Sequence, residues 1–217
     1  MTILEGLANA VINGEEEKVV ELVRIAIEEK CNLLKAIDDG LVKGIQILGK
    51  RFGEGEVFLP ELVMGANAMK AGNSLLNTEI IKTGLERKIL GKVVIGTVKG
   101  DIHDIGKTLV GTMLSVNGFE VIDLGVDNTA KQFMEVVRKE KADIVGLSSL
   151  LTTTMTYMSE VIKNFEKAGT RDKVKIMIGG APVSEEFAKQ IGADGYGYNA
   201  QQAVEVAKQL MKKRGDK

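Results

Sequence analysis

The sequence predicts an α/β protein in two parts, a helical bundle followed by a doubly wound parallel sheet. Two observations support this prediction. From residue 1 to residue 87 the apolar residues recur at helical spacing, with almost no β-branched runs. After Gly91, five short β-rich runs alternate with helical stretches. We therefore expect a helical domain over residues 1–87, a second domain over residues 91–217, and a linker at residues 85–91.

The N-terminal part is predicted to be a four-helix bundle. Its helically spaced apolar positions include Val19, Leu22, Val23, Ala26 and Ile27, and then Leu41, Ile45, Leu48 and Phe52. Breaks are expected at residues 13–17, at residues 52–56 and around Gly84. Pro60 suits the first turn of the last helix, because proline there gives up an amide that would have no helical partner.

The second part should form a five-stranded parallel sheet from residues 92–98, 120–125, 143–149, 173–180 and 193–197. Nearly continuous apolar strands between helices favour a sheet that is covered on both faces, and right-handed crossovers favour the doubly wound arrangement. In such a sheet, ligands bind beyond the carboxyl ends of the strands, near the point where the strand order reverses. The loops at 99–106, 148–154 and 179–180 should meet at that edge.

Composition excludes several partner classes. The chain carries 29 Lys and Arg against 30 Asp and Glu, a net charge of −1, and it has no basic block or zinc-finger spacing, so we expect no nucleic-acid partner. A single cysteine, Cys31, cannot form an internal disulfide. The first residues lack a signal-peptide pattern, and no apolar run approaches membrane-spanning length. We expect a cytoplasmic protein with no membrane partner.

The stretch KGDIHDIGKTL, residues 99–109, holds the only histidine of the chain. Asp101 and His103 lie two residues apart, so the carboxylate could accept a hydrogen bond from one imidazole nitrogen and leave the other free as a ligand or base. Alternatively, Asp101 or Asp104 caps a helix N-terminus and His103 has no role. A metal cage built from the protein alone is less favoured, because Cys31 lies in the other part of the chain and few soft ligands remain.

Three spaced motifs carry a family resemblance. D-x-H-x-x-G, S-x-L and G-G stand here as Asp101, His103 and Gly106, then Ser148 and Leu150, then Gly179 and Gly180. Their order and spacing resemble those of cobalamin-binding domains. With the helical part included, nearly the whole chain resembles the corrinoid proteins of methyltransferase systems, which are also similar to the cobalamin module of methionine synthase. The resemblance implies a flavodoxin-like, Rossmann-like cobalamin-binding domain and, as cofactor, cobalamin or a related corrinoid containing cobalt.

The resemblance also implies roles for single residues. His103 would bind cobalt in place of the benzimidazole of the cofactor, Asp101 would assist it at the reacting centre, and the displaced nucleotide tail would enter the sheet. The residues implied to bind the cofactor in this domain are Asp101, His103, Asp104, Ile105, Gly106, Ser148, Leu150, Thr152, Thr154, Gly179 and Gly180. Position 154 is threonine where methionine synthase has serine, but a hydroxyl is retained. Taken alone, the glycine pair also fits a tight turn, and residues 148–154 also fit a hydroxyl-rich helix start.

The helical part would act as a cap. Family resemblance suggests that Phe58 and Met64, on either side of Pro60, cover the methyl-bearing face of the corrin and exclude water. In the alternative interpretation, Phe58 packs on Val63 as a hydrophobic staple, and Met64 and Met69 belong to the bundle core.

The function implied by the resemblance is that of a methyl carrier. The protein would accept a methyl group on Co(I) from a donor held by a substrate-specific methyltransferase, and pass it to a folate or a thiol through an acceptor methyltransferase. Catalysis would require these partners and a reductive activation protein. A cobalamin-dependent sensor is the main alternative, although no basic recognition helix is visible; a mutase module and a receiver-like signalling domain fit less well. The donor stays open among methanol, methylamines, betaines and methoxylated aromatics.

Overall fold

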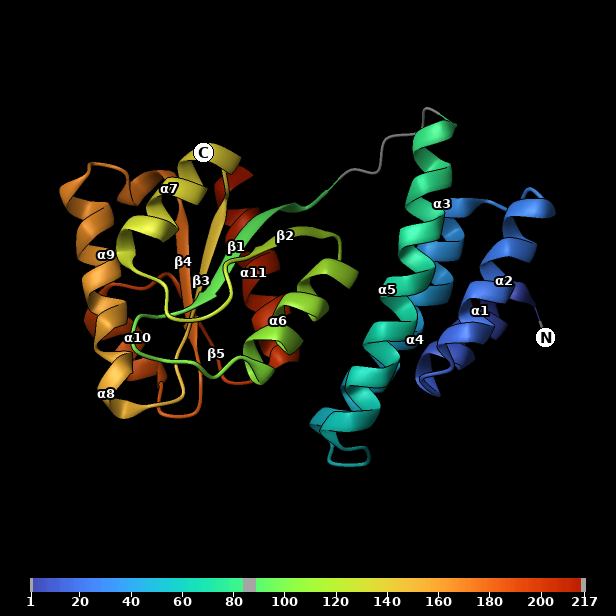
Figure 1. The fold of residues 1–217 in the computed structure, drawn as a ribbon, viewed down its shortest axis with the longest axis horizontal. Coiled ribbons are helices and arrows are strands. Elements are labelled where there is room, and N and C mark those ends of the chain that lie inside the picture. The colour runs from blue at the N-terminus through green and yellow to red at the C-terminus, as the bar shows by residue number, and fades with distance from the viewer. Residues whose placement is uncertain (1, 84–88, 216–217) are drawn as a thin grey trace. The chain divides into compact units, whose positions relative to one another are not determined.

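The computed structural model describes residues 2–83 and 89–215, which belong to two compact units divided between Lys88 and Ile89. Figure 1 labels their helices and strands. In the first unit these are α1 (Ile3–Ile12), α2 (Glu16–Glu28), α3 (Leu33–Lys35), the π-helical segment η1 (Ala36–Val42), α4 (Lys43–Gly53) and α5 (Leu59–Lys82). No helix within the two described ranges is both long and apolar enough to cross a membrane.

The first unit is a helical bundle, as predicted. The segments α3, η1 and α4 follow one another without a break, so the described residues form four helical rods. The expected breaks at 13–17 and 52–56 are confirmed, and the one near Gly84 lies outside the described residues. A further break between α2 and α3 was not predicted. Helix α5 has Pro60 in its first turn, and Glu61 Oε2 accepts a hydrogen bond from the Phe58 amide at 2.8 Å.

Apolar side chains from all four rods fill the bundle. The fully buried residues include Leu7, Val11, Val19, Leu41, Ile45, Met69 and Leu76. The rods α1 and α4 approach closely, because a Cβ on Gly44 would lie 2.6 Å from the Ala8 carbonyl oxygen. Met69 is in the core, as the staple interpretation predicts, but its placement of Met64 there was wrong: Met64 is 53% exposed, and Phe58 is 73% exposed.

The second unit is an α/β sandwich around one sheet. Its elements are β1 (Gly91–Thr97), α6 (Ile105–Val116), β2 (Phe119–Asp123), α7 (Ala130–Glu140), β3 (Ile144–Ser148), α8 (Thr152–Met155), α9 (Tyr157–Lys167), η2 (Arg171–Lys173), β4 (Lys175–Gly179), α10 (Glu185–Ile191), β5 (Gly195–Gly197) and α11 (Ala200–Gly215). The strands are parallel in the order β2-β1-β3-β4-β5. This flavodoxin-like, doubly wound order confirms the predicted fold class.

Helices cover both faces of this sheet (Figure 1). α6 and α11 pack against each other on one face, and α7, α9 and α10 pack on the other. The strand order reverses between β1 and β3, so the loops after these two strands leave toward opposite faces. Thr97, Ser148 and Gly179 form the last row of the register across β1, β3 and β4. A crevice is therefore expected beyond that row.

The close approach at Gly44 predicts sensitivity to the smallest side chain. Gly44→Ala should lower the free energy of unfolding of the helical unit by about 1–3 kcal/mol, because the new methyl group meets backbone rather than a movable side chain. Gln46→Ala, at an exposed position of the same helix, should change stability by less than about 0.5 kcal/mol. Urea denaturation of both variants, followed by circular dichroism, measures the difference. Equal stability of the two variants would contradict the tight crossing of α1 and α4.

Candidate functional site

The centre of the site is the carboxylate of Asp101, which has no exposed surface. Its Oδ1 accepts hydrogen bonds from the His103 amide at 3.0 Å and from His103 Nδ1 at 2.8 Å. Its Oδ2 accepts from Leu150 N at 2.8 Å, Thr154 Oγ1 at 2.8 Å, Ser149 Oγ at 3.1 Å and Leu151 N at 3.3 Å. One carboxylate therefore joins the loop after β1 to the loop after β3.

These contacts decide the charge of Asp101. Burial by itself would raise the pKa of the carboxyl group, but hydrogen bonds from the backbone of His103 and Leu150 and from the side chains of His103 and Thr154 hold the pKa well below its usual range. The group is therefore an ionised acceptor at neutral pH, and its partner Nδ1 must be the donor. In the neutral ring, Nε2 is then unprotonated, with a lone pair available to a ligand.

A cavity of about 630 Å³ adjoins His103, whose side chain is 46% exposed. It extends from the loops into the sheet, because Ile95, Gly146 and Met177 also line it. These three residues are register neighbours on β1, β3 and β4, two positions inside the last row. At about 3.3 Å per residue, the cavity reaches roughly 7 Å below the edge of the sheet.

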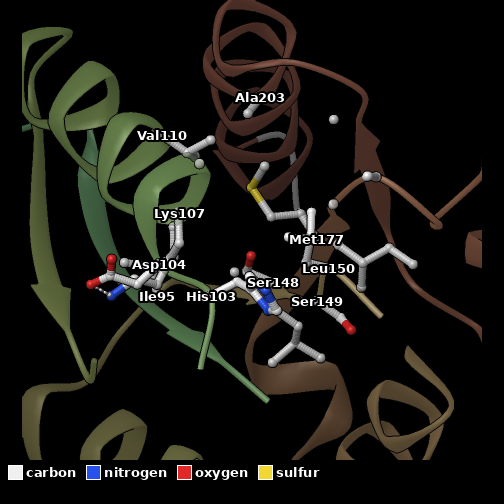
Figure 2. A pocket seen from close by; sticks show the side chains of 18 of the residues that line it. Ile95, His103, Asp104, Lys107, Val110, Ser148, Ser149, Leu150, Met177 and Ala203 are labelled. Atoms are coloured by element: carbon white, nitrogen blue, oxygen red, sulfur yellow. Dashed lines mark ion pairs between the residues drawn. The ribbon is translucent and has the colours of Figure 1, made fainter. Parts of the chain in front are cut away.

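The helices α6 and α11 supply the walls of the cavity. Gly106, Val110 and Leu114 line it from α6, and their spacing of four places them on one stripe of the helix. Ala203 lines it from α11. Figure 2 shows His103, Ser148 and Ser149 close together, with Val110, Met177 and Ala203 around the same space. The inner part is thus a slot with small or apolar walls.

The lysine in this wall is already paired. Lys107 has a side chain that is 1% exposed, and its Nζ lies 2.5 Å from Asp123 Oδ1 and 3.9 Å from Asp104 Oδ2. Figure 2 marks the pair with Asp104. Two carboxylates therefore compensate the buried ammonium group, as a buried charge requires.

The structure brings most of the predicted site residues of this unit together. Those that line the cavity are His103, Asp104, Ile105, Gly106, Ser148, Leu150, Gly179 and Gly180. Thr154 instead supports Asp101 through a hydrogen bond. Thr152 lies exposed in the first turn of α8, outside the lining. Asp104 occupies the N-cap position of α6 without a side-chain capping bond. Phe58 and Met64 lie on the helical unit.

Sequence reasoning missed several residues of the site, and three of them, Ser149, Gly146 and Lys107, show why. Ser149, which is 1% exposed, donates to Asp101 Oδ2, and its Oγ lies 2.7 Å from Thr154 Oγ1. Adjacent residues of a strand point to opposite sides, so only one of Ser148 and Ser149 could reach Asp101, and the sequence does not say which. Gly146 had a visible signal, because a glycine inside a strand often marks a close approach. Lys107 had none beyond its proximity to His103.

The glycine pair after β4 has a structural reason of its own. A Cβ on Gly179 would lie 2.8 Å from the Gly197 carbonyl oxygen, and a Cβ on Gly180 would overlap the Ser149 carbonyl oxygen. Gly180 also has φ of +128°, in the region that favours glycine. Both glycines are therefore required by the neighbouring backbone, whatever the cavity holds.

His103 offers a single nitrogen to a metal. Within residues 2–83 and 89–215, no group of three or more His, Cys, Asp or Glu side chains is placed so that it could hold a metal ion. A nitrogen beside a deep slot fits a cobalt-containing macrocycle that brings its other ligands with it and carries an elongated tail.

Comparison with known proteins places the chain in a family. Two protein-family models, each described as a B12 binding domain, match the sequence at residues 3–77 and at residues 91–205. The chain is 44% identical to a corrinoid protein from Desulfitobacterium hafniense, over 98% of this chain and 99% of the relative. It is 42% identical to dimethylamine corrinoid protein 2 from Methanosarcina acetivorans, over 96% of each.

Solved structures agree with this assignment. The fold is similar to a chain of the methanol:cobalamin methyltransferase complex MtaBC from Methanosarcina barkeri, with a TM-score of 0.85 and 34% identity, covering 97% of this chain and 80% of that chain. It is also similar to the monomethylamine corrinoid protein of the same organism, with a TM-score of 0.53 and 36% identity, covering 96% and 98%. The chain therefore belongs to the corrinoid proteins of methyltransferase systems, a family of B12-binding methyl carriers.

Proposed function

We propose that His103 binds the cobalt of a corrinoid through Nε2 and that Asp101 holds the ring for this task. The observation that carries the proposal is the 2.8 Å hydrogen bond between Asp101 Oδ1 and His103 Nδ1 beside the cavity. It sets the tautomer and the ring orientation together. A hydrogen bond to a charged group contributes about 1.5–3 kcal/mol, which is enough to select one tautomer but small beside the burial of a large cofactor.

The residues of the chain then have separate tasks. When bound, the corrinoid supplies the methyl-accepting and methyl-donating chemistry through its cobalt. His103 supplies one ligand, and Asp101 keeps Nδ1 protonated. Ser149 and Thr154 satisfy the second oxygen of that carboxylate, so that Asp101 cannot turn toward another donor. The protein thereby orients a ligand without contributing a group that reacts with the methyl donor.

The slot is proposed to hold the nucleotide tail of the cofactor. Its depth, and the absence of a side chain at Gly146 in the middle row, suit an elongated planar group. Packing does not require a glycine at position 106, at the mouth of the cavity, as it does at Gly179 and Gly180, because a Cβ on Gly106 would meet no atom within 4 Å. Its missing side chain enlarges the cavity and serves no packing need within the described residues.

The helical unit is proposed to shield the methyl group. Phe58, Val63 and Met64 are exposed on one end of α5, at 73%, 37% and 53%. Apolar side chains with this exposure are available to contact the corrin and exclude water from it. The 1–87 part would then act as a cap, as the family resemblance implies.

The partners proposed are a substrate-specific methyltransferase, an acceptor methyltransferase and a reductive activation protein. A small methylated amine is the proposed donor. Support comes from identities of 42% to dimethylamine corrinoid protein 2 of Methanosarcina acetivorans and 40% to trimethylamine corrinoid protein 2 of Methanosarcina mazei.

Gly106 provides the first test. Gly106→Ala should leave the cofactor-free protein as stable as before or stabilise it by up to about 1 kcal/mol, because the backbone accepts alanine and the unfolded chain loses freedom. Cobalamin affinity should fall, and Gly106→Val should lower it about tenfold or more, equivalent to about 1.4 kcal/mol. Gly111→Ala is the matched control in the same helix, since its Cβ would meet ordinary contacts at 3.6 Å and Gly111 does not line the cavity. Unchanged affinity of Gly106→Val in an equilibrium titration would refute the slot.

His103 provides the second test. His103→Ala should retain most of its cobalamin, because the slot remains, but its absorption spectrum should become that of cobalamin without a lower nitrogen ligand. Asp101→Asn should remain ligated more weakly, since the charged acceptor is lost. Lys99→Ala, which trims an exposed side chain of the same loop that does not line the cavity, should keep the wild-type spectrum. If His103→Ala also kept it, another group would occupy the lower position.

The donor is tested with the partner enzyme. The native protein, purified together with its methyltransferase, should be methylated faster with monomethylamine, dimethylamine or trimethylamine than with methanol or glycine betaine. The rate of loss of Co(I) absorbance measures this. A clear preference for methanol or a betaine would overturn the proposed donor class and leave the cofactor site as described.

A further inference from the structure

The turn that ends at Asp101, just before His103, is hydrogen bonded to Asp127, which does not line the cavity. The Asp101 amide donates to the Val98 carbonyl at 3.1 Å, which closes a turn over Val98, Lys99, Gly100 and Asp101. Gly100 has φ of +82°, the value that a type II turn requires at its third residue. A type I turn would differ mainly by a flip of the central peptide, which joins Lys99 to Gly100.

Asp127 distinguishes the two orientations of that peptide. Its Oδ1 accepts a hydrogen bond from the Gly100 amide at 2.7 Å. Flipping the peptide would turn the Lys99 carbonyl oxygen, instead of an N–H group, toward a carboxylate. Because two acceptors repel each other at that distance, the carboxylate selects the observed orientation.

The backbone of Asp127 makes a second contact with the same turn. Its amide donates to the Asp101 carbonyl at 3.0 Å. To do so, Asp127 adopts φ of +57°, in the left-handed region that few residues other than glycine occupy. Such backbone strain costs about 1 kcal/mol or more and persists where the surroundings require it. Two further hydrogen bonds fix this segment to the end of β1. The Asn128 amide donates to the Thr97 carbonyl, and the Thr97 amide donates to the Gly125 carbonyl, each at 3.0 Å.

We propose that Asp127 is a positioning residue for His103. Its carboxylate fixes the Lys99–Gly100 peptide, its amide holds the Asp101 carbonyl, and the turn in consequence presents Asp101 to His103 Nδ1. The proposal rests on the proposed role of His103 as a cobalt ligand, but it concerns the ring before any cofactor binds.

The single histidine of the chain allows a direct test. In cofactor-free, full-length protein labelled with ¹⁵N-histidine, the two ring nitrogens report the tautomer of His103 alone. Asp127→Gly removes the carboxylate, retains the amide and relieves the left-handed strain. It should lower the ratio of Nδ1-protonated to Nε2-protonated ring about tenfold, while the melting temperature stays equal or rises. Asp127→Asn, whose side-chain oxygen can still accept from Gly100 and which tolerates positive φ, should restore the wild-type ratio.

Lys141→Gly is the matched control, because Lys141 also has φ of +54° in the same unit and ends α7. It should leave the histidine signals unchanged. A wild-type tautomer ratio in Asp127→Gly, or equal losses in Asp127→Gly and Asp127→Asn, would overturn the proposal. If Asp127→Gly does not fold, hydrogen exchange in the wild-type protein decides: protection of the Gly100 amide supports the proposal, and exchange at the rate of an unstructured peptide overturns it.

The same variants separate this proposal from the cofactor role. Loaded with cobalamin, Asp127→Gly should show a larger fraction of unligated spectrum than Asp127→Asn. If the His103→Ala spectrum equals that of the wild type while the ¹⁵N signals follow Asp127 as expected, the ligand role fails and the positioning role stands. If the ¹⁵N signals ignore Asp127, the positioning role fails whatever the spectrum of His103→Ala.

Discussion

The rest of the site depends on one buried negative charge. Asp101 has no exposed surface, and its carboxylate is stable there because it accepts six hydrogen bonds from two loops that are about 50 residues apart. Removing a charge from water costs free energy unless protein donors replace the water. The two loops are therefore fixed in the positions from which they can donate to Asp101. The position of His103 follows from the same requirement, since its amide and its ring are two of the six donors.

The sheet explains why these loops can meet beside a cavity. β1 and β3 are neighbours, and their connections leave toward opposite faces, so the space beyond their carboxyl ends remains open. On the face covered by α6 and α11, glycine at 106 and 146 keeps that space continuous with the interior of the sheet. An imidazole at the mouth and a slot behind it are thus two consequences of one topology. They can act separately, one by ligation and the other by retention of the cofactor.

Much of this organisation could be predicted from the sequence, because periodicity reports which surfaces are buried. Apolar spacing predicted the bundle and the five strands, and D-x-H-x-x-G predicted the Asp101–His103 pair. The placements that could not be predicted depend on contacts with residues that are distant in the sequence. Ser149, rather than Ser148, reaches Asp101 because of the side to which the end of β3 turns. Met64 is exposed because the helical spacing that places Met69 in the core turns position 64 away from it. Thr152 shares the hydroxyl-rich stretch with Thr154 but lies outside the cavity.

Glycine shows most clearly why a motif does not by itself identify a binding surface. Gly106, Gly179 and Gly180 belong to the same family pattern, yet only at Gly106 would an added Cβ meet nothing. At Gly179 and Gly180 the backbone of β5 and of the loop after β3 already excludes a side chain. Those two glycines therefore let the loops approach, which places Ser149 and the Leu150 amide within reach of Asp101. Gly106 leaves room for a ligand instead.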